Sequence, residues 1–283
     1  MEYKNLIETC IVPKLLQLEF KKQCMPQDLL GRSLAYSCFL PRLADSGYLY
    51  ENFRRLDGAP PFKGLCVKAE KLPHILQTST LDNRPPALDS LDQKDEILCI
   101  LLEEQAQGDD VDSADYIGLI RRLTPAFIIQ SGVVIDSYQI LEAAVVGADF
   151  VLLDARLLRA YALLLALTQN LNCETTASDI TSLLATQNPN PNDLKEHKQI
   201  LKELLNKLVV TASNLGLAPI IKVHDKEDLS LLLALKQAID CLLSPQDLVR
   251  LVPNSYLIFS ESKLADGEEN TAYGVDVLLR PAD

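Results

Sequence analysis

The feature that most constrains the fold of this chain is a repeated alternation of short apolar runs and longer amphipathic stretches, which begins near Gly64. The runs are almost wholly apolar, as expected for strands of a parallel sheet that is covered on both faces. The stretches between them have helical spacing, which is typical of repeated βα units. We predict strands at Gly64–Lys68, Ile97–Leu102, Ala126–Gln130, Phe150–Leu153, Pro219–Val223, Ile239–Leu243, Tyr256–Phe259 and Val275–Leu279.

Eight strands of this kind favour an α/β fold that closes into a (β/α)8 TIM barrel. A count that is wrong by one strand would restore an open doubly wound sheet as the alternative. The length of 283 residues suits one barrel, for which roughly 250 residues is typical, although length alone also allows two small domains. We therefore expect residues 1–283 to form a single barrel domain.

Three regions are expected to depart from the simplest barrel. Residues 1–60 predict a helical N-terminal extension, because apolar residues recur at near-helical spacing from Leu6 to Leu18 and the pattern repeats from Asp28 to Leu40. Residues 160–197 predict an inserted connection after the fourth strand, since the sequence TQNPNPND is typical of a surface loop. The last strand lies so close to Asp283 that we expect a reduced C-terminal end, without an eighth outer helix.

Two of the helices between strands have clear ends in the sequence. After the third strand, Asp136 and Ser137 are candidate N-caps and Gly147 is a candidate C-cap. A second helix is predicted from Leu194 to Leu215 and ends at Gly216.

The composition excludes several classes of protein. A net charge of -12 argues against a nucleic-acid partner, because such binding requires clustered Lys and Arg. The N-terminal sequence MEYKNLIETC does not predict a signal peptide, and the longest uncharged apolar segment is too short to span a membrane. We expect a soluble, cytoplasmic protein with no membrane partner. Its cysteines are expected to be reduced, because they form no C-x-x-C pair and several lie inside apolar runs, where a free thiol behaves as a small buried hydrophobe. These cysteines are Cys10, Cys24, Cys38, Cys66, Cys99, Cys173 and Cys241.

The second half of the chain carries motifs of a known family. The stretch VVIDSYQILEAAVVGADFVLLDARLL at 133–158 resembles the segment of indole-3-glycerol phosphate synthase that runs from the end of strand three through strand four. Further similar segments are SADYIGLIRRL at 113–123, IIKVHDKEDL at 220–229 and YLIFSES at 256–262. The resemblance covers nearly the whole chain and is more specific after residue 113 than before it.

The resemblance implies a carbon-carbon lyase of tryptophan biosynthesis. Members of that family are decarboxylases. They close an indole ring on a phosphorylated anthranilate-ribulose substrate, with loss of carbon dioxide and water. The chemistry needs a proton donor, usually Lys, and a carboxylate, both held at the C-terminal ends of the strands. It also needs a glycine-rich phosphate site after strands seven and eight.

Carried over residue by residue, the family pattern is only partly kept. The first predicted strand keeps its Lys as Lys68, but its Glu becomes Cys66. The acid of the second strand is Glu103. The general-acid Lys after the third strand becomes Ser131, and a serine hydroxyl cannot replace an ammonium as a proton donor at neutral pH. The catalytic Glu of the fifth strand becomes Lys222.

The last three strands differ from the family in the same way. The Asn and Arg that follow the sixth strand are absent. The seventh strand keeps Glu261 and Ser262, but the next Gly becomes Lys263. At the eighth strand the phosphate turn is replaced by a segment with Pro281, which lacks a backbone N–H. We therefore name Lys68, Glu103 and Glu261 as catalytic candidates and Ser262 and Lys222 as substrate-binding candidates, with a small phosphorylated or anionic ligand.

Lys222 is the most unusual of these residues, because it interrupts an apolar strand. We predict that it forms a salt bridge with Glu261 first and Glu103 second, since a buried ammonium requires a partner; a substrate-binding role is the alternative. His224 is interpreted as a capping or packing residue. The three histidines have no partners at metal-ligand spacing, so we expect neither a metal nor another cofactor.

Two functions follow from these differences. The first is a barrel that has lost lyase activity, a pseudoenzyme that binds or regulates. The second is an active indole-3-glycerol phosphate synthase whose acid and base come from other positions. We favour the first function, because it explains the several changed catalytic and phosphate-binding positions with fewer special assumptions. The sequence leaves the oligomeric state open.

Overall fold

The computed structural model describes residues 2–43, 46–68, 97–103, 114–169, 193–235, 239–261 and 274–281. Its eight strands are parallel and close into a barrel in the order of the sequence. They are β1 (Phe62–Lys68), β2 (Ile97–Glu103), β3 (Phe127–Gln130), β4 (Phe150–Asp154), β5 (Ala218–Lys222), β6 (Cys241–Leu243), β7 (Leu257–Glu261) and β8 (Val277–Pro281). The predicted (β/α)8 barrel is confirmed, and every predicted strand end lies within two residues of the observed one.

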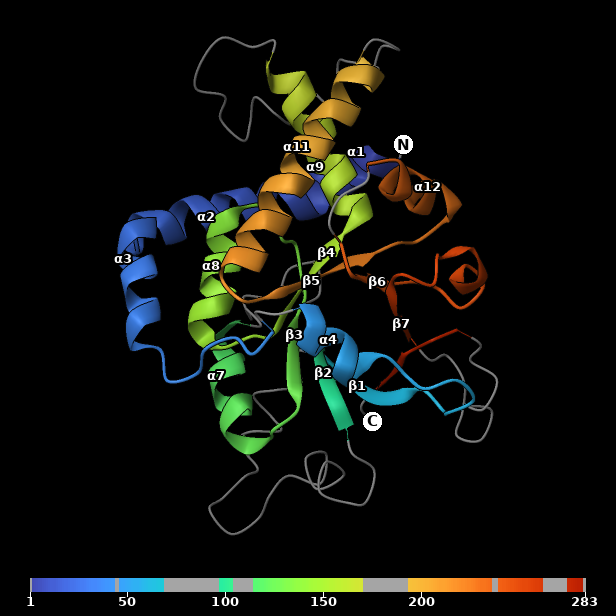
Figure 1. Cartoon of the computed structure of the whole chain (residues 1–283). Helices are drawn as coiled ribbons and strands as arrows, with labels where there is room; N and C mark the ends of the chain where they lie inside the picture. The colour runs from blue at the N-terminus through green and yellow to red at the C-terminus, as the bar shows by residue number, and fades with distance from the viewer. Residues whose placement is uncertain are drawn as a thin grey trace.

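Helices precede the barrel and alternate with its strands (Figure 1). Those before β1 are α1 (Glu2–Leu6), the π-helix η1 (Ile7–Ile11), α2 (Val12–Cys24), α3 (Gln27–Ser33), the 3-10 turn η2 (Leu34–Tyr36) and α4 (Ser46–Phe53). Those within the barrel are α7 (Ala114–Leu123), α8 (Ser137–Val146), α9 (Ala155–Gln169), α11 (Asp193–Asn214), α12 (Lys226–Leu235) and the 3-10 turn η4 (Val249–Leu251). Figure 1 shows α9 and α11 side by side, extending beyond the end of the barrel.

The sequence located the helix ends well where side chains cap them. Asp136 caps α8: it accepts the N–H of Tyr138, and the Gln139 side chain accepts the N–H of Asp136 in return. Gly147 ends α8 with φ 92°, and α11 ends just before Gly216, with φ 78°. Both helix predictions are confirmed, with Asp136 as the cap of the first.

The predicted helix from Asp28 to Leu40 is shorter than expected. The structure ends it at Tyr36, and the chain then runs past the end of α8. There the Ser37 hydroxyl donates to the carbonyl of Val145 at 2.8 Å, which fixes a non-helical path. In the region predicted as an inserted connection, α9 and α11 are helical, and residues 170–192 lie outside the described part of the chain.

The barrel interior is filled by alternate residues of every strand. The inward-facing core contains Cys99, Leu101, Phe127, Ile129, Phe150, Leu152, Ala218, Ile220, Cys241, Leu243, Leu257, Phe259, Val277 and Leu279. At the N-terminal end of the barrel, Phe53 of α4 packs against Phe127 and Phe150, with ring centroids 4.9 and 5.1 Å apart. This aromatic cluster closes that end. The next inward positions at the opposite end are polar, and they form the candidate site.

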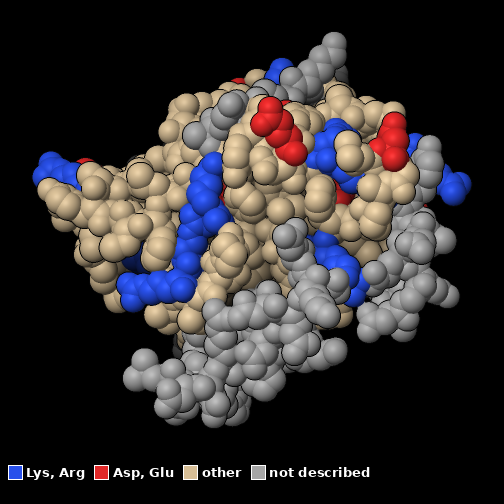
Figure 2. All heavy atoms as spheres, turned by 60° about the horizontal axis from the view of Figure 1, so that its bottom comes forward, with Lys and Arg blue, Asp and Glu red and all other residues tan. Residues whose placement is uncertain are grey.

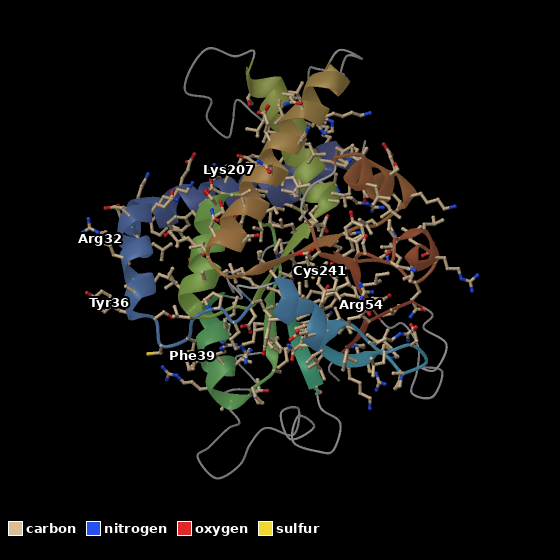
Figure 3. The ribbon with its side chains drawn as sticks, in the orientation of Figure 1. Arg32, Tyr36, Phe39, Arg54, Lys207 and Cys241 are labelled. Carbon is tan, nitrogen blue, oxygen red and sulfur yellow. The ribbon has the colours of Figure 1, made fainter. Side chains whose placement is uncertain are left out.

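The N-terminal end is also held by buried ion pairs. Asp149, which is fully buried, accepts the guanidinium groups of Arg42 and Arg121 at 2.7 Å each and the N–H of Ile128 at 2.9 Å. Arg54, labelled in Figure 3, pairs with the buried Asp276 at 3.3 Å. These pairs connect the segments before β1, through Arg42 and Arg54, and α7, through Arg121, to acids that directly precede β4 and β8.

Candidate functional site

The C-terminal ends of the strands surround two cavities that meet at Lys222. The first, the β1–β5 cavity, has a volume of about 540 Å³ and is lined by Lys68, Glu103, Ser131, Asp154 and Lys222, with Asn5 and Thr9 of the N-terminal helices. The second, the β5–β7 cavity, has a volume of about 510 Å³ and is lined by Arg156, Lys222, His224, Ser244, Asp247 and Glu261 among others. Active sites of TIM barrels lie at this end of the strands.

Lys222 and Glu261 form an ion pair at the mouth, as predicted. The Lys222 Nζ donates to Glu261 Oε1 at 2.8 Å. Burial by itself would lower the pKa of Lys222, but the hydrogen bond and charge of Glu261, with further charge from Asp154 and Glu103, raise that pKa above its ordinary value. The second predicted partner, Glu103, therefore acts on Lys222 through its charge. Lys222 is a stable cation at neutral pH.

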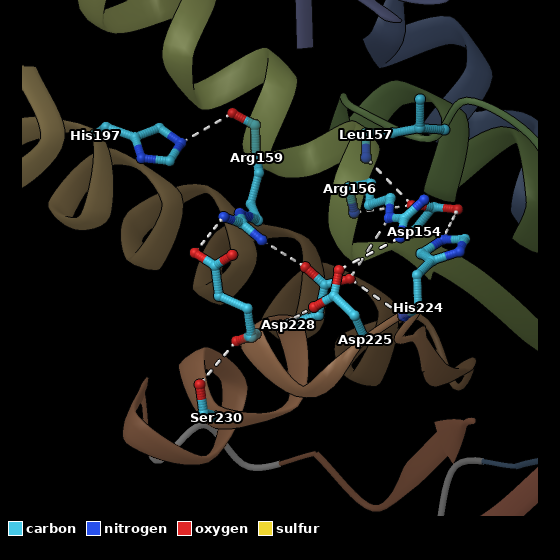
Figure 4. Close-up of polar contacts among 10 residues, drawn as sticks. Asp154, Arg156, Leu157, Arg159, His197, His224, Asp225, Asp228 and Ser230 are labelled. Carbon is cyan, nitrogen blue, oxygen red and sulfur yellow. Dashed lines mark hydrogen bonds and ion pairs between the residues drawn. The ribbon is translucent and has the colours of Figure 1, made fainter. Parts of the chain in front are cut away.

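Asp154 is a site residue that the sequence analysis missed. It ends β4 in register with Lys222 and accepts His224 Nε2 at 2.8 Å and the N–H groups of Arg156 and Leu157 at 2.9 and 3.2 Å (Figure 4). Burial tends to raise the pKa of Asp154, but the hydrogen bond and charge of His224 and the N–H of Leu157 outweigh it, so the pKa is lowered. Its position after the apolar run FVLL, at the end of a predicted strand, was the available signal.

His224 does more than the predicted capping or packing. Its ring is paired with Asp154, while its backbone N–H donates to Asp228 Oδ2 at 3.1 Å. Asp228, fully buried, also accepts Arg159 at 2.7 Å, which ties α9 to α12 (Figure 4). His197 Nε2 bonds the carbonyl of Arg159 at 2.9 Å. This network holds the segments that follow β4 and β5 in place.

The residues at the C-terminal ends of the first three strands differ in their chemistry from those of β4 and β5. The Ser131 hydroxyl is buried and donates to the carbonyl of Leu102 at 2.9 Å, so it serves the backbone of β2. The Cys66 thiol donates to Glu103 Oε2 at 3.7 Å. Burial, followed by the charges of Glu103 and Glu261, raises the pKa of this thiol to about 12, which leaves it protonated and unreactive at neutral pH.

Lys68 and Glu103 lie opposite each other on β1 and β2, and both line the β1–β5 cavity. Lys68 is exposed and Glu103 is half-buried. Within the described ranges, no salt bridge engages either side chain. Lys68 and Glu103 are therefore one positive and one negative group of this cavity that have no salt-bridge partner among the described residues, whereas Lys222 and Asp154 are engaged with Glu261 and His224.

Other expectations about the site fall at the edge of the described chain. Ser262 and Lys263 lie outside the described residues, as do His74 and Cys173. Pro281 is the exposed last residue of β8 and has no N–H to donate. Over the ranges that the structure describes, no group of three or more His, Cys, Asp or Glu side chains is placed to hold a metal ion.

The outer surface adds two observations. On the face shown in Figure 2, the Lys and Arg side chains lie in separate groups with uncharged residues between them. Together with the net charge of -12, this differs from the clustered basic surface of a nucleic-acid-binding domain. Among the described helices, none has both the length and the apolar composition needed to cross a membrane.

Comparison with known proteins gives one consistent family. No family model matches the chain. Indole-3-glycerol phosphate synthase of Campylobacter jejuni subsp. doylei is 28% identical over 280 residues, 93% of this chain and 88% of the relative. The enzyme of the same name from Campylobacter hominis is 29% identical over 273 residues, 93% of this chain and 87% of the relative.

Among solved structures, KGPDC from Streptococcus mutans overlaps 79% of this chain and 88% of its own, with a TM-score of 0.43 and 12% identity. Each of the two sequence relatives covers 93% of this chain. The chain is thus similar over most of its length, at 28% and 29% identity, to two enzymes named indole-3-glycerol phosphate synthase.

Proposed function

We propose that this chain is an indole-3-glycerol-phosphate-synthase-like barrel that has lost most or all lyase activity and binds a small anionic ligand at the mouth. The observation that carries this proposal is the ion pair between Lys222 and Glu261, 2.8 Å apart. By the family resemblance, position 222 belongs to a catalytic carboxylate. A paired ammonium with a raised pKa cannot accept a proton there. Its ion pair also engages the neighbouring carboxylate, that of Glu261.

The general acid is the second group that the proposal treats as lost. Ser131 stands where the resemblance places a Lys, and its hydroxyl is engaged with the carbonyl of Leu102. The pKa of an alcohol lies far above neutral, so the hydroxyl is a poor proton donor to a carbonyl substrate. Loss of one such group typically costs about two to four orders of magnitude in rate.

The β1–β5 cavity supports the binding role. Lys68 presents an exposed ammonium for a phosphoryl or carboxylate group, and Glu103 presents a carboxylate for an N–H or O–H of the same ligand. Asn5 and Thr9 line the other side of this cavity. The free thiols of the described cysteines, such as Cys10 and Cys99, support the proposed cytoplasmic location.

The direct test is a fluorescence assay of indole-glycerol phosphate formation from the phosphorylated anthranilate-ribulose substrate. We expect turnover at least about a hundredfold slower than that of the Campylobacter hominis relative measured in parallel, because both the acid and the carboxylate are replaced. Steady turnover within about tenfold of that enzyme would instead establish an active synthase with relocated catalytic groups.

The phosphate site of the family is also expected to be missing. Pro281 removes a backbone donor from the end of β8, and the sequence replaces the glycine that follows Ser262 by Lys263. Crystals soaked in sulfate should therefore show no anion held by main-chain amides between β7 and β8. A sulfate bound there by two or more backbone N–H groups would contradict this prediction.

A further inference from the structure

Lys222 is reachable from both cavities although its charge is already balanced. It lines the β1–β5 cavity and the β5–β7 cavity, and 23% of its side chain is exposed. The carboxylate that balances it, Glu261, lines the β5–β7 cavity as well. An anion that enters this cavity therefore meets the carboxylate together with the ammonium, and the repulsion offsets the attraction.

The other nitrogen-bearing side chains of the β5–β7 cavity that have acidic partners, Arg156 and His224, are paired with acids outside the cavity. Arg156 pairs with Asp225 at 3.3 Å, and His224 pairs with Asp154 at 2.8 Å. Neither of these acids lines the β5–β7 cavity. Of the two acids that line it, Glu261 is ion-paired with Lys222, and Asp247 has no salt bridge among the described residues. Removing the carboxylate of Glu261 would thus change the charge of the cavity at the point where Lys222 reaches it.

We infer that Glu261 determines the charge specificity of the mouth by blocking a latent site for a phosphate-sized oxyanion centred on Lys222. This inference rests on the proposed binding function. With the Lys222 site blocked, the anionic group of a ligand is directed to Lys68 across the β1–β5 cavity. Without the Glu261 carboxylate, the Lys222 ammonium keeps its charge, is partly desolvated, and binds an oxyanion through charge-assisted hydrogen bonds.

The test compares binding of inorganic phosphate by the parent chain and by Glu261→Gln at pH 7, with chloride at matched ionic strength as the reference. We expect Glu261→Gln to bind phosphate with a Kd of about 1 mM, at least about tenfold tighter than the parent, in a ³¹P NMR titration. About 10 mM phosphate should raise the Tm of the variant by about 3 °C and leave that of the parent nearly unchanged.

Two controls separate the site from a general charge effect. Glu203→Gln removes an exposed carboxylate on α11 that lines neither cavity, and should bind phosphate no better than the parent. Lys222→Met combined with Glu261→Gln should lose the gain, because it removes the cation. Glu261→Ser is measured in parallel and removes the same charge if the Gln variant does not fold.

The inference is overturned if neither Glu261 variant binds phosphate at least about tenfold more tightly than the parent, or if the gain survives in the double variant. These outcomes are independent of the lyase assay on the parent chain. A parent that turns over the synthase substrate contradicts the proposed loss of activity, whereas a failed phosphate titration contradicts only the role of Glu261.

Discussion

Replacement of Asp149 by alanine is expected to lower the free energy of unfolding by about 3–5 kcal/mol. The Asp149 carboxylate is fully buried and accepts hydrogen bonds from two guanidinium groups. One of these belongs to Arg121, whose side chain is only 6% exposed. It also accepts the N–H of Ile128 in β3. The substitution leaves Arg121 buried without its anion and leaves a backbone donor unsatisfied.

The measurement is urea unfolding at pH 7, followed by circular dichroism. Asp57→Ala is the matched control, because Asp57 is exposed in the turn before β1 and should change stability by less than about 0.5 kcal/mol. Equal unfolding midpoints for the two variants would show that the Arg42 and Arg121 contacts contribute little, and would refute this account of the N-terminal end.

The second large effect is expected from Lys222→Glu, which introduces the residue type that the family resemblance implies at this position. The new carboxylate would face Glu261 and lie near Asp154 and Glu103, whose charges now favour the Lys222 cation. We expect destabilisation of about 1–3 kcal/mol at pH 7, because a favourable pair becomes a repulsive cluster in a partly desolvated mouth.

The pH dependence of this variant should have the same sign as that of the Lys222 contribution in the parent, but it should lie in a much lower pH window. Crowding raises the pKa of carboxylates in the folded variant above the unfolded value, so its stability relative to the parent should recover as the pH falls through the raised pKa. In the parent, the raised pKa of Lys222 contributes stability that is fully present at pH 7 and is lost only as the pH rises through that value.

Unfolding of both proteins by urea between about pH 5 and pH 8 measures the difference. Lys202→Glu, an exposed substitution on α11 with the same change in net charge, is the control. If Lys222→Glu is as stable as the parent at pH 7, or if the difference does not shrink on acidification, the ion pair has no energetic role.

The sequence predicted the barrel because its signal is repeated and local. Each strand is a short apolar run, and the helix between β3 and β4 carries caps, Asp136 and Gly147, that act within a few residues. The strand ends shifted by one or two residues, since apolar periodicity does not show where hydrogen bonding to a neighbouring strand stops. The early end of the helix at Tyr36 depends on Val145, a contact more than a hundred residues away.

The site was predicted in part for a similar reason. The pairing of Lys222 with Glu261 followed from the cost of an unpaired ammonium and from the placement of alternate strands around one mouth. The bond between Asp154 and His224 was not predicted, because Asp154 follows an apolar run like an ordinary strand end and His224 was interpreted as a capping or packing residue. The engagement of the Ser131 hydroxyl by Leu102 depends on the register of β2 and β3, which the sequence does not reveal.

Within the described part of the chain, the aromatic cluster around Phe53 of α4 closes the N-terminal end of the barrel, which is therefore shaped like a cup that opens at the C-terminal ends of the strands. A ligand of the proposed site is expected to arrive and depart over this rim, past Lys68 and Lys222. Binding and release then share one route, and a bound molecule blocks access for the next. The two ends of the barrel can also be changed separately by mutation. Changes at Asp149 should alter the stability of the protein in denaturant, and changes at Glu261 should alter which anion binds at the mouth.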